Sequence, residues 1–202
     1  KKADIGVAMG ITGTEVSKDA ASMILSDDNF ATIIKAVANG RTVYNNIKNA
    51  VLYLLSGNFS AIITVIYASL MALPVPFQAV QLLFINLVTD SLPALAIGME
   101  PGAKDVLDKK PRNPKQGILD KKFVTLMVSQ GVLIALSVIT AFMSGLSVTP
   151  EAASTMAFAT LTLARLLHGF NCRGEHSILT LGFKNNMYSL GAFVLGLILF
   201  AA

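Results

Sequence analysis

Charged residues are scarce in this chain of 202 residues. They make up 14% of the sequence, against about 25% in a typical soluble domain, while 53% of the residues are hydrophobic. So few charges exclude an ordinary soluble protein, and they exclude a disordered chain because such chains are polar and highly charged. Cysteine is scarcer still, and the single Cys172 excludes a disulfide scaffold. The composition predicts an integral membrane protein with a soluble part.

A secretory leader is also lacking, since no long apolar run follows the basic start at Lys1 and Lys2. The sequence begins without methionine and ends inside an apolar stretch, 190–202. We therefore expect a segment of a longer protein that continues at both ends.

The first 29 residues are the part with soluble character. Two short strand-like runs flank a turn and a helix-forming segment, 15–22. The order strand, helix, strand is typical of a parallel α/β sheet, so we expect a short α/β unit here. Asp27, Asp28 and Asn29 then offer capping side chains to a helix that begins near Phe30.

A helical pattern without proline runs from Phe30 to beyond residue 70. A continuous helix of about 40 residues would be roughly 60 Å long at 1.5 Å per residue. Its first part, 30–49, is amphipathic and its second part is apolar. We expect a rigid stalk that leaves the soluble part and enters a membrane.

Five apolar segments are long enough, or nearly so, to cross a bilayer core about 30 Å thick. They are 50–73, 77–99, 123–146, 152–170 and 187–202.

Lysine and arginine gather in the loop 100–122 and recur after the fourth segment at Arg173 and Lys184, but are lacking in the two other loops. The positive-inside tendency places the long loop and the soluble part in the cytosol. Aspartates dilute this basic loop and it holds no aromatic residue, so we expect no nucleic-acid partner.

Asn86, Thr89 and Asp90 lie in the second apolar segment, where polar groups are costly and need a reason. Their spacing predicts one shared helical face, and Pro93 frees carbonyl oxygens in the preceding turn. Carboxylate, amide, hydroxyl and carbonyl oxygens favour a hard cation such as Ca²⁺, Na⁺, K⁺ or Mg²⁺. The alternatives are interhelical hydrogen bonding by Asn86 and Thr89, and pairing of Asp90 with an internal arginine.

Two further segments carry polar residues. Asn58 lies at a similar depth in the first segment, where an ion-ligand role and a packing role are equally open. Arg165 lies in the fourth segment, where its side chain either snorkels to the cytosolic interface or points towards Asp90 as a permanent internal cation. We expect His168 near the interface and Cys172 as an inert thiol at the cytosolic end.

Four parts of the chain carry recognisable motifs: 4–10 through 26–30, 45–48 with 56–58, 86–94 (NLVTDSLPA) and 109–114. In this order they resemble the end of the phosphorylation domain, the fifth transmembrane helix, the sixth transmembrane helix and the loop after helix six of P-type Ca²⁺-ATPases. The motifs occur in order and the resemblance covers nearly the whole chain. It implies the carboxyl-side part of a pump. The expected fold is a mainly α polytopic membrane bundle, preceded by a short α/β end of a Rossmann-like, haloacid-dehalogenase-type phosphorylation domain.

The implied parts are the phosphorylation-domain end (1–29), the stalk of helix five (30–49) and transmembrane helices five to nine (50–202). The function implied is ATP-driven export of Ca²⁺ with proton countertransport, in a plasma membrane of bacterial type. ATP and Mg²⁺ would be bound by parts outside this chain, because the family's DKTGT and GDGVND motifs are absent from it. The chain alone is therefore not expected to hydrolyse ATP. Its implied partners are membrane lipid, the transported cation and the rest of the same polypeptide.

The ion ligands that the resemblance implies come from helices five and six. They are Asn86 and Asp90 at a site shared with helix four, and Thr89, Asp90 and Asn58 at a second site. Two-site pumps of the family have glutamates where this chain has Ala61 and Arg165. A lost carboxylate plus a gained cation should abolish the second site, because two charges at about 4 Å interact by several kcal/mol at an effective dielectric near 20. The pattern resembles that of single-site bacterial Ca²⁺ pumps. We therefore expect one Ca²⁺ to be exported per ATP, with Arg165 in place of the second ion.

Three rival functions stay open on the residues alone. A related P-type pump for Na⁺, K⁺, H⁺ or Mg²⁺ would use similar oxygen ligands. The α/β start and the long helix argue against a channel or secondary carrier. Asp90 and Arg165 inside apolar segments argue against a purely structural membrane element.

Overall fold

The computed structural model describes residues 4–103, 105–113, 117–174, 182 and 185–201. The chain divides into two compact units, Lys1–Val43 with Gly102–Lys110 and Tyr44–Pro101 with Pro111–Ala202. The predicted basic loop residues Lys104, Lys115 and Lys184 lie outside the described residues, as does Pro114 of the motif 109–114.

The first unit begins with strand β1 (Val7–Met9), helix α1 (Glu15–Ala20) and strand β2 (Met23–Leu25). The two strands pair in parallel, with Ala8 opposite Ile24. This confirms the predicted order of strand, helix and strand. A sheet of two strands does not by itself show a Rossmann-like domain.

The turn between β1 and α1 is closed from two sides. A Cβ atom on Gly13 would overlap the carbonyl oxygen of Met9, so a side chain does not fit there. The carboxylate of Asp28 accepts hydrogen bonds from the backbone nitrogens of Ile11 at 2.8 Å and Thr12 at 2.7 Å, and from the Thr12 hydroxyl at 2.7 Å. These bonds, with that from Ile11 the largest cause, lower the pKa of Asp28 to about 2.

Helix α2 runs from Ala31 to Leu70 without interruption and supplies residues to both units. The Asn29 side chain accepts a hydrogen bond at 2.9 Å from the backbone nitrogen of Ala31, which caps the helix as predicted. Within the first unit, Nη1 of Arg41 donates to the carbonyl oxygens of Val106 at 2.9 Å and Lys109 at 2.7 Å. One guanidinium thus holds the loop after the second apolar segment against α2.

The second apolar segment, predicted as one helix over 77–99, forms three pieces. They are α3 (Ala79–Phe84), the π-helical turn η1 (Ile85–Thr89) and α4 (Ser91–Gly98). The backbone nitrogen of Asp90 donates at 2.9 Å to the carbonyl of Ile85, five residues back. A widened turn of this kind is rare and frequently lies at functional sites. Pro93 follows it and supplies no backbone donor.

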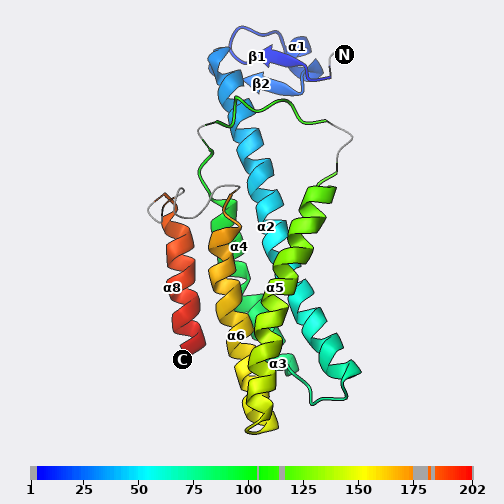
Figure 1. The fold of residues 1–202 in the computed structure, drawn as a ribbon. Helices are drawn as coiled ribbons and strands as arrows, with labels where there is room; N and C mark the ends of the chain where they lie inside the picture. The colour runs from blue at the N-terminus through cyan, green and yellow to red at the C-terminus, as the bar shows by residue number, and fades with distance from the viewer. Residues whose placement is uncertain (1–3, 104, 114–116, 175–181, 183–184, 202) are drawn as a thin grey trace. The chain divides into compact units, whose positions relative to one another are not determined.

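Helices α5 (Lys121–Leu146) and α6 (Pro150–Asn171) form an antiparallel pair and lie side by side (Figure 1). Gly145 permits the close approach at the connection, because a Cβ there would overlap the backbone of Ala153. The Thr149 hydroxyl caps α6 by accepting from the backbone nitrogen of Ala152 at 3.1 Å. Buried residues from these helices, α2 and the second segment form the main core: Ala68, Phe77, Ile85, Ile134, Val138, Phe142, Ala153, Ala157 and Leu161.

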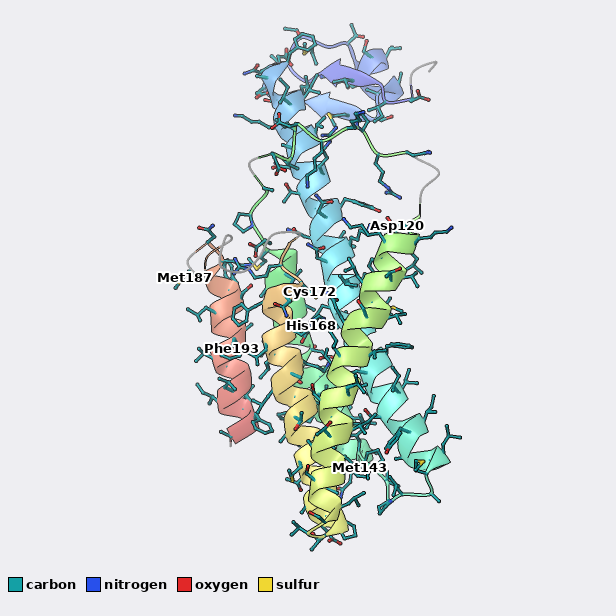
Figure 2. All side chains as sticks on the ribbon, viewed as in Figure 1. Asp120, Met143, His168, Cys172, Met187 and Phe193 are labelled. Carbon is teal, nitrogen blue, oxygen red and sulfur yellow. The ribbon has the colours of Figure 1, made fainter. Side chains whose placement is uncertain are left out.

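Helix α8 (Met187–Ala201) packs against α4 and α6. The ring of Phe193, labelled on α8 in Figure 2, lies 5.2 Å from that of Phe170, centroid to centroid. A Cβ on Gly196 would come within 2.5 Å of the Leu166 side chain, so glycine at this position lets α8 approach α6 closely.

Three helical stretches of the described residues are long and apolar enough to cross a membrane: Ala31–Leu70, Ala79–Gly98 and Lys121–Leu146. The prediction had five. Helix α6 is long enough, but its threonines, serine, arginine and histidine lower its hydropathy, and α8 has 15 apolar residues, fewer than the roughly 20 that a span needs. Large apolar side chains such as Ile66, Leu133 and Leu136 are more than half exposed. Their exposure fits a surface that faces lipid.

Candidate functional site

Asp90 and Arg165 form a buried ion pair between the second apolar segment and α6. The guanidinium nitrogen Nη2 of Arg165 donates to Oδ2 of Asp90, and the two residues are 1% and 2% exposed. The same Nη2 lies 3.3 Å from Oδ1 of Asn58 on α2. One cation therefore joins three helical segments, so of the two predicted positions for Arg165 the inward one is observed and snorkelling to the interface is not.

Space for the guanidinium comes from Gly57. A Cβ at this position would lie 2.5 Å from Nε and 2.6 Å from Nη2 of Arg165. Any larger residue there would push the guanidinium away. Gly57, which the sequence offered only as a point of close helix approach, thus determines where the arginine lies.

An open groove of about 590 Å³ lies beside this pair. Its lining includes the predicted ligands Asn58, Asn86 and Asp90, together with Ser91, the first residue of α4. Within the described part of the chain, Oδ1 of Asp90 is buried and accepts no hydrogen bond. A buried carboxylate oxygen without a donor is costly, and a hard cation at the groove would satisfy it.

Thr89 is placed differently from the other three predicted ligands. It is fully buried, its hydroxyl donates to the Ile85 carbonyl at 2.9 Å, and it is not among the residues that line the groove. The predicted common face assumed a regular helix, whereas the π turn changes the phase at this position. The freed carbonyl predicted from Pro93 is that of Thr89, and it accepts from the Tyr53 hydroxyl at 3.3 Å.

A second polar group, which the sequence did not predict, lies one turn further along α6. His168 is 5% exposed, so it lies packed between helices, and its expected depth near the membrane interface stays a prediction. Its Nε2 lies 2.9 Å from the Ser56 hydroxyl and 3.3 Å from the Cys172 thiol, and its ring stacks on Tyr53. Figure 2 labels His168 on α6 and Cys172 directly after the end of that helix. Burial with hydrogen bonds marks this group as part of the packing between α2 and α6.

A further buried group that sequence reasoning missed joins Glu100 to Arg173 and Asn186. Arg173 is 73 positions from Glu100 in the sequence, and Asn186 is 86 positions from it. The one signal in the sequence was a charged residue just after α4 and another just after α6. No group of three or more His, Cys, Asp or Glu side chains in the described ranges could hold a metal ion. A cation at the groove would therefore depend on amide and carbonyl oxygens as much as on Asp90.

The family model and the related sequences that match this chain all point to one family. The family described as "Cation transporting ATPase, C-terminus" matches residues 74–202. The chain is 46% identical over 202 residues to "Calcium-transporting ATPase" of Bacillus subtilis (strain 168), covering 98% of this chain and 23% of the relative. It is 48% identical over 201 residues to "Calcium-transporting ATPase lmo0841" of Listeria monocytogenes, covering 99% and 23%. The human "Calcium-transporting ATPase type 2C member 1" is 40% identical over 190 residues, covering 92% and 21%. The chain thus spans less than a quarter of the length of these relatives.

Proposed function

The chain belongs to the cation-transporting ATPase family, whose carboxyl-terminal region it carries, and we propose that it is part of a P-type pump that exports Ca²⁺ at the cost of ATP. The observation that carries this proposal is the buried, donor-free oxygen of Asp90 beside a groove that Asn58 and Asn86 also line. All three side chains offer oxygen, the donor that Ca²⁺ prefers.

The parts of the chain take the following places in the proposed pump. The unit β1–α1–β2 is the end of a phosphorylation domain (1–29), and 30–49 of α2 is the stalk of helix five. Residues 50–202 are transmembrane helices five to nine, with α6 and α8 as the two spans beyond the three that length and hydropathy identify. What supports this division is the uninterrupted α2 and the large exposed apolar side chains of the helices.

The proposed site holds one Ca²⁺. Asn86 and Asp90 would bind it on this chain's side of the groove, and helix four of the complete pump would supply the remaining ligands. A second position would be bordered by Thr89, Asp90 and Asn58. The Arg165 guanidinium, which contacts Asn58 and Asp90, would occupy it. Ala61 adds no carboxylate there. A permanent cation held at this position would repel a second Ca²⁺.

The charge of Arg165 would remain in place through the cycle, so each ATP would move one ion. ATP and Mg²⁺ would bind to parts of the pump outside this chain. Protons would return across the membrane in exchange for Ca²⁺. The membrane would be a bacterial plasma membrane. The bacterial relatives at 46% and 48% identity support this location.

Calcium uptake by the complete pump tests the proposal. Inverted vesicles that contain the full-length protein should accumulate ⁴⁵Ca²⁺ when ATP is added, and vanadate should stop the uptake. Asp90→Asn should abolish it, whereas Asp108→Asn, an exposed aspartate in the loop after α4, should retain it. Vanadate-sensitive hydrolysis that depends on Na⁺, K⁺ or Mg²⁺ and not on Ca²⁺ would keep the pump and overturn the calcium assignment.

A further inference from the structure

Two buried ion pairs link the second apolar segment and the residues just after it to α6 and the residues just after that helix. The first is Asp90 with Arg165, and the second is Glu100 with Arg173. Glu100 follows Asp90 by ten residues and Arg173 follows Arg165 by eight, so the pairs are separated by roughly 12–15 Å along the two helices. The second pair lies outside the groove and has no part in the proposed ion site.

The Glu100 pair has the geometry of a rigid connection. Nε and Nη2 of Arg173 donate to the two carboxylate oxygens of Glu100 at 2.8 and 2.9 Å, and Nη1 donates to the carbonyl of Gly182 at 3.1 Å. Asn186 donates to the same carboxylate at 2.6 Å. Arg173 is 2% exposed and Glu100 is 7% exposed. A bidentate pair with its remaining donors satisfied holds one relative orientation of the two side chains.

Asn186 also caps the carboxyl end of α4 together with Asn46, because the last carbonyls of a helix lack partners within the helix. Asn186 donates to the carbonyl of Ala96 at 2.9 Å, while its own side-chain oxygen accepts from the backbone nitrogen of Ser189 at the start of α8. Asn46 on α2 donates to the carbonyls of Gly98 at 3.1 Å and Glu100 at 2.7 Å. Side chains from α2 and from the residue before α8 therefore fix the end of α4.

We propose that Glu100, Arg173 and Asn186 are positioning residues that fix the register of α4 against α6 and so hold Asp90 at pairing distance from Arg165, with its second oxygen available to the cation. The proposal rests on the proposed function of Asp90. A ligand held in its binding orientation loses less free energy to ordering when the ion arrives. Loosening the Glu100 connection should therefore weaken cation binding more than it slows turnover.

The test uses the full-length pump, purified and checked for a monodisperse folded state. Glu100→Gln should raise the Ca²⁺ concentration for half-maximal ATP hydrolysis at least fivefold, while the maximal rate per folded molecule falls less than twofold. Glu151→Gln, an exposed carboxylate at the other end of α6, is the matched control and should change nothing.

A double-mutant cycle separates positioning from general destabilisation. If Glu100 acts through the Asp90–Arg165 pair, the effect of Glu100→Gln should shrink to within twofold in the Arg165→Ala background. An equal effect in both backgrounds, or a half-saturating concentration within twofold of wild type, would overturn the inference. Should Glu100→Gln fail to fold, Asn186→Ala keeps the ion pair and should still weaken Ca²⁺ activation. A wild-type pump without Ca²⁺-dependent hydrolysis would instead defeat the proposed function.

Discussion

Asp90 gives only one of its two carboxylate oxygens to Arg165, and the other is buried without a donor in the described part of the chain. Removing charges from water costs several kcal/mol for each ion, and a buried pair recovers this only when its remaining donors and acceptors are satisfied. Here Nε of Arg165 also has no partner among the described residues. The pair is thus incompletely satisfied, in contrast to Glu100 and Arg173. For this reason we propose an ion site at the first pair and a structural connection at the second.

Tyr53 should stabilise the broken helix at the site. Its hydroxyl donates at 3.3 Å to the Thr89 carbonyl, which the missing donor of Pro93 leaves without a helical partner. Tyr53→Phe leaves this buried oxygen unsatisfied, so we expect a loss of about 1–3 kcal/mol in unfolding free energy. Thermal unfolding of the full-length pump measures it. Tyr188→Phe, at a largely exposed tyrosine, is the control, and an equal melting temperature for both variants would show that the Thr89 carbonyl needs no partner.

Gly57 should tolerate no side chain. Gly57→Ala places a methyl group 2.5 Å from Nε of Arg165, so the guanidinium must leave its position beside Asp90. We expect a lower melting temperature and weaker Ca²⁺ activation in this variant. Gly40→Ala on the same helix has nothing within 4 Å of the added methyl, and it should stabilise the helix by about 0.5–1 kcal/mol. Similar behaviour of the two alanine variants would contradict the close packing of Arg165 on Gly57.

Asp28 should make the stability of the first unit depend on acid pH. Its pKa is lowered to about 2, with the hydrogen bond from the Ile11 backbone as the largest cause. A folded-state pKa below the unfolded value of about 3.9 gives a stabilising contribution that is complete above about pH 4 and is lost as pH falls towards 2. The ¹³C chemical shift of the Asp28 carboxyl group should titrate with a midpoint near 2.

The Thr12 hydroxyl offers a direct check on this assignment, because it also donates to Asp28. Thr12→Val removes that donor and keeps the backbone nitrogen, so the midpoint should rise. A titration midpoint near 4 in the wild-type protein, or an unchanged midpoint in Thr12→Val, would contradict the hydrogen bonds assigned to Asp28.

The sequence predicted those features that depend on local pattern. A 40-residue helix follows from the absence of proline and the capping Asn29, and it starts at Ala31, one residue from the predicted Phe30. The parallel strand pair follows from its strand–helix–strand order. The π turn was not predictable, since it inserts one residue per turn without a distinct composition, and it moves Thr89 away from the groove.

Contacts between residues far apart in the sequence were harder to predict. The sequence left two positions for Arg165 open, and only the space over Gly57 decides between them. The Glu100–Arg173 pair gave no signal because its residues are far apart in the chain and each is an ordinary charge at a helix end. The roles of Asn58, Asn86, Thr89 and Asp90 as ion ligands stay predictions that transport measurements must test.

The stoichiometry of transport tests the central claim most directly. ATP-driven ⁴⁵Ca²⁺ uptake and phosphate release should be counted in parallel in vesicles that hold the full-length pump. We expect about one Ca²⁺ per ATP in the wild type, because the charge of Arg165 would occupy the second position. The ratio should rise towards two when Ala61→Glu and Arg165→Glu are combined. A wild-type ratio near two would overturn the proposed single site, and so would a ratio near one that the double substitution leaves unchanged.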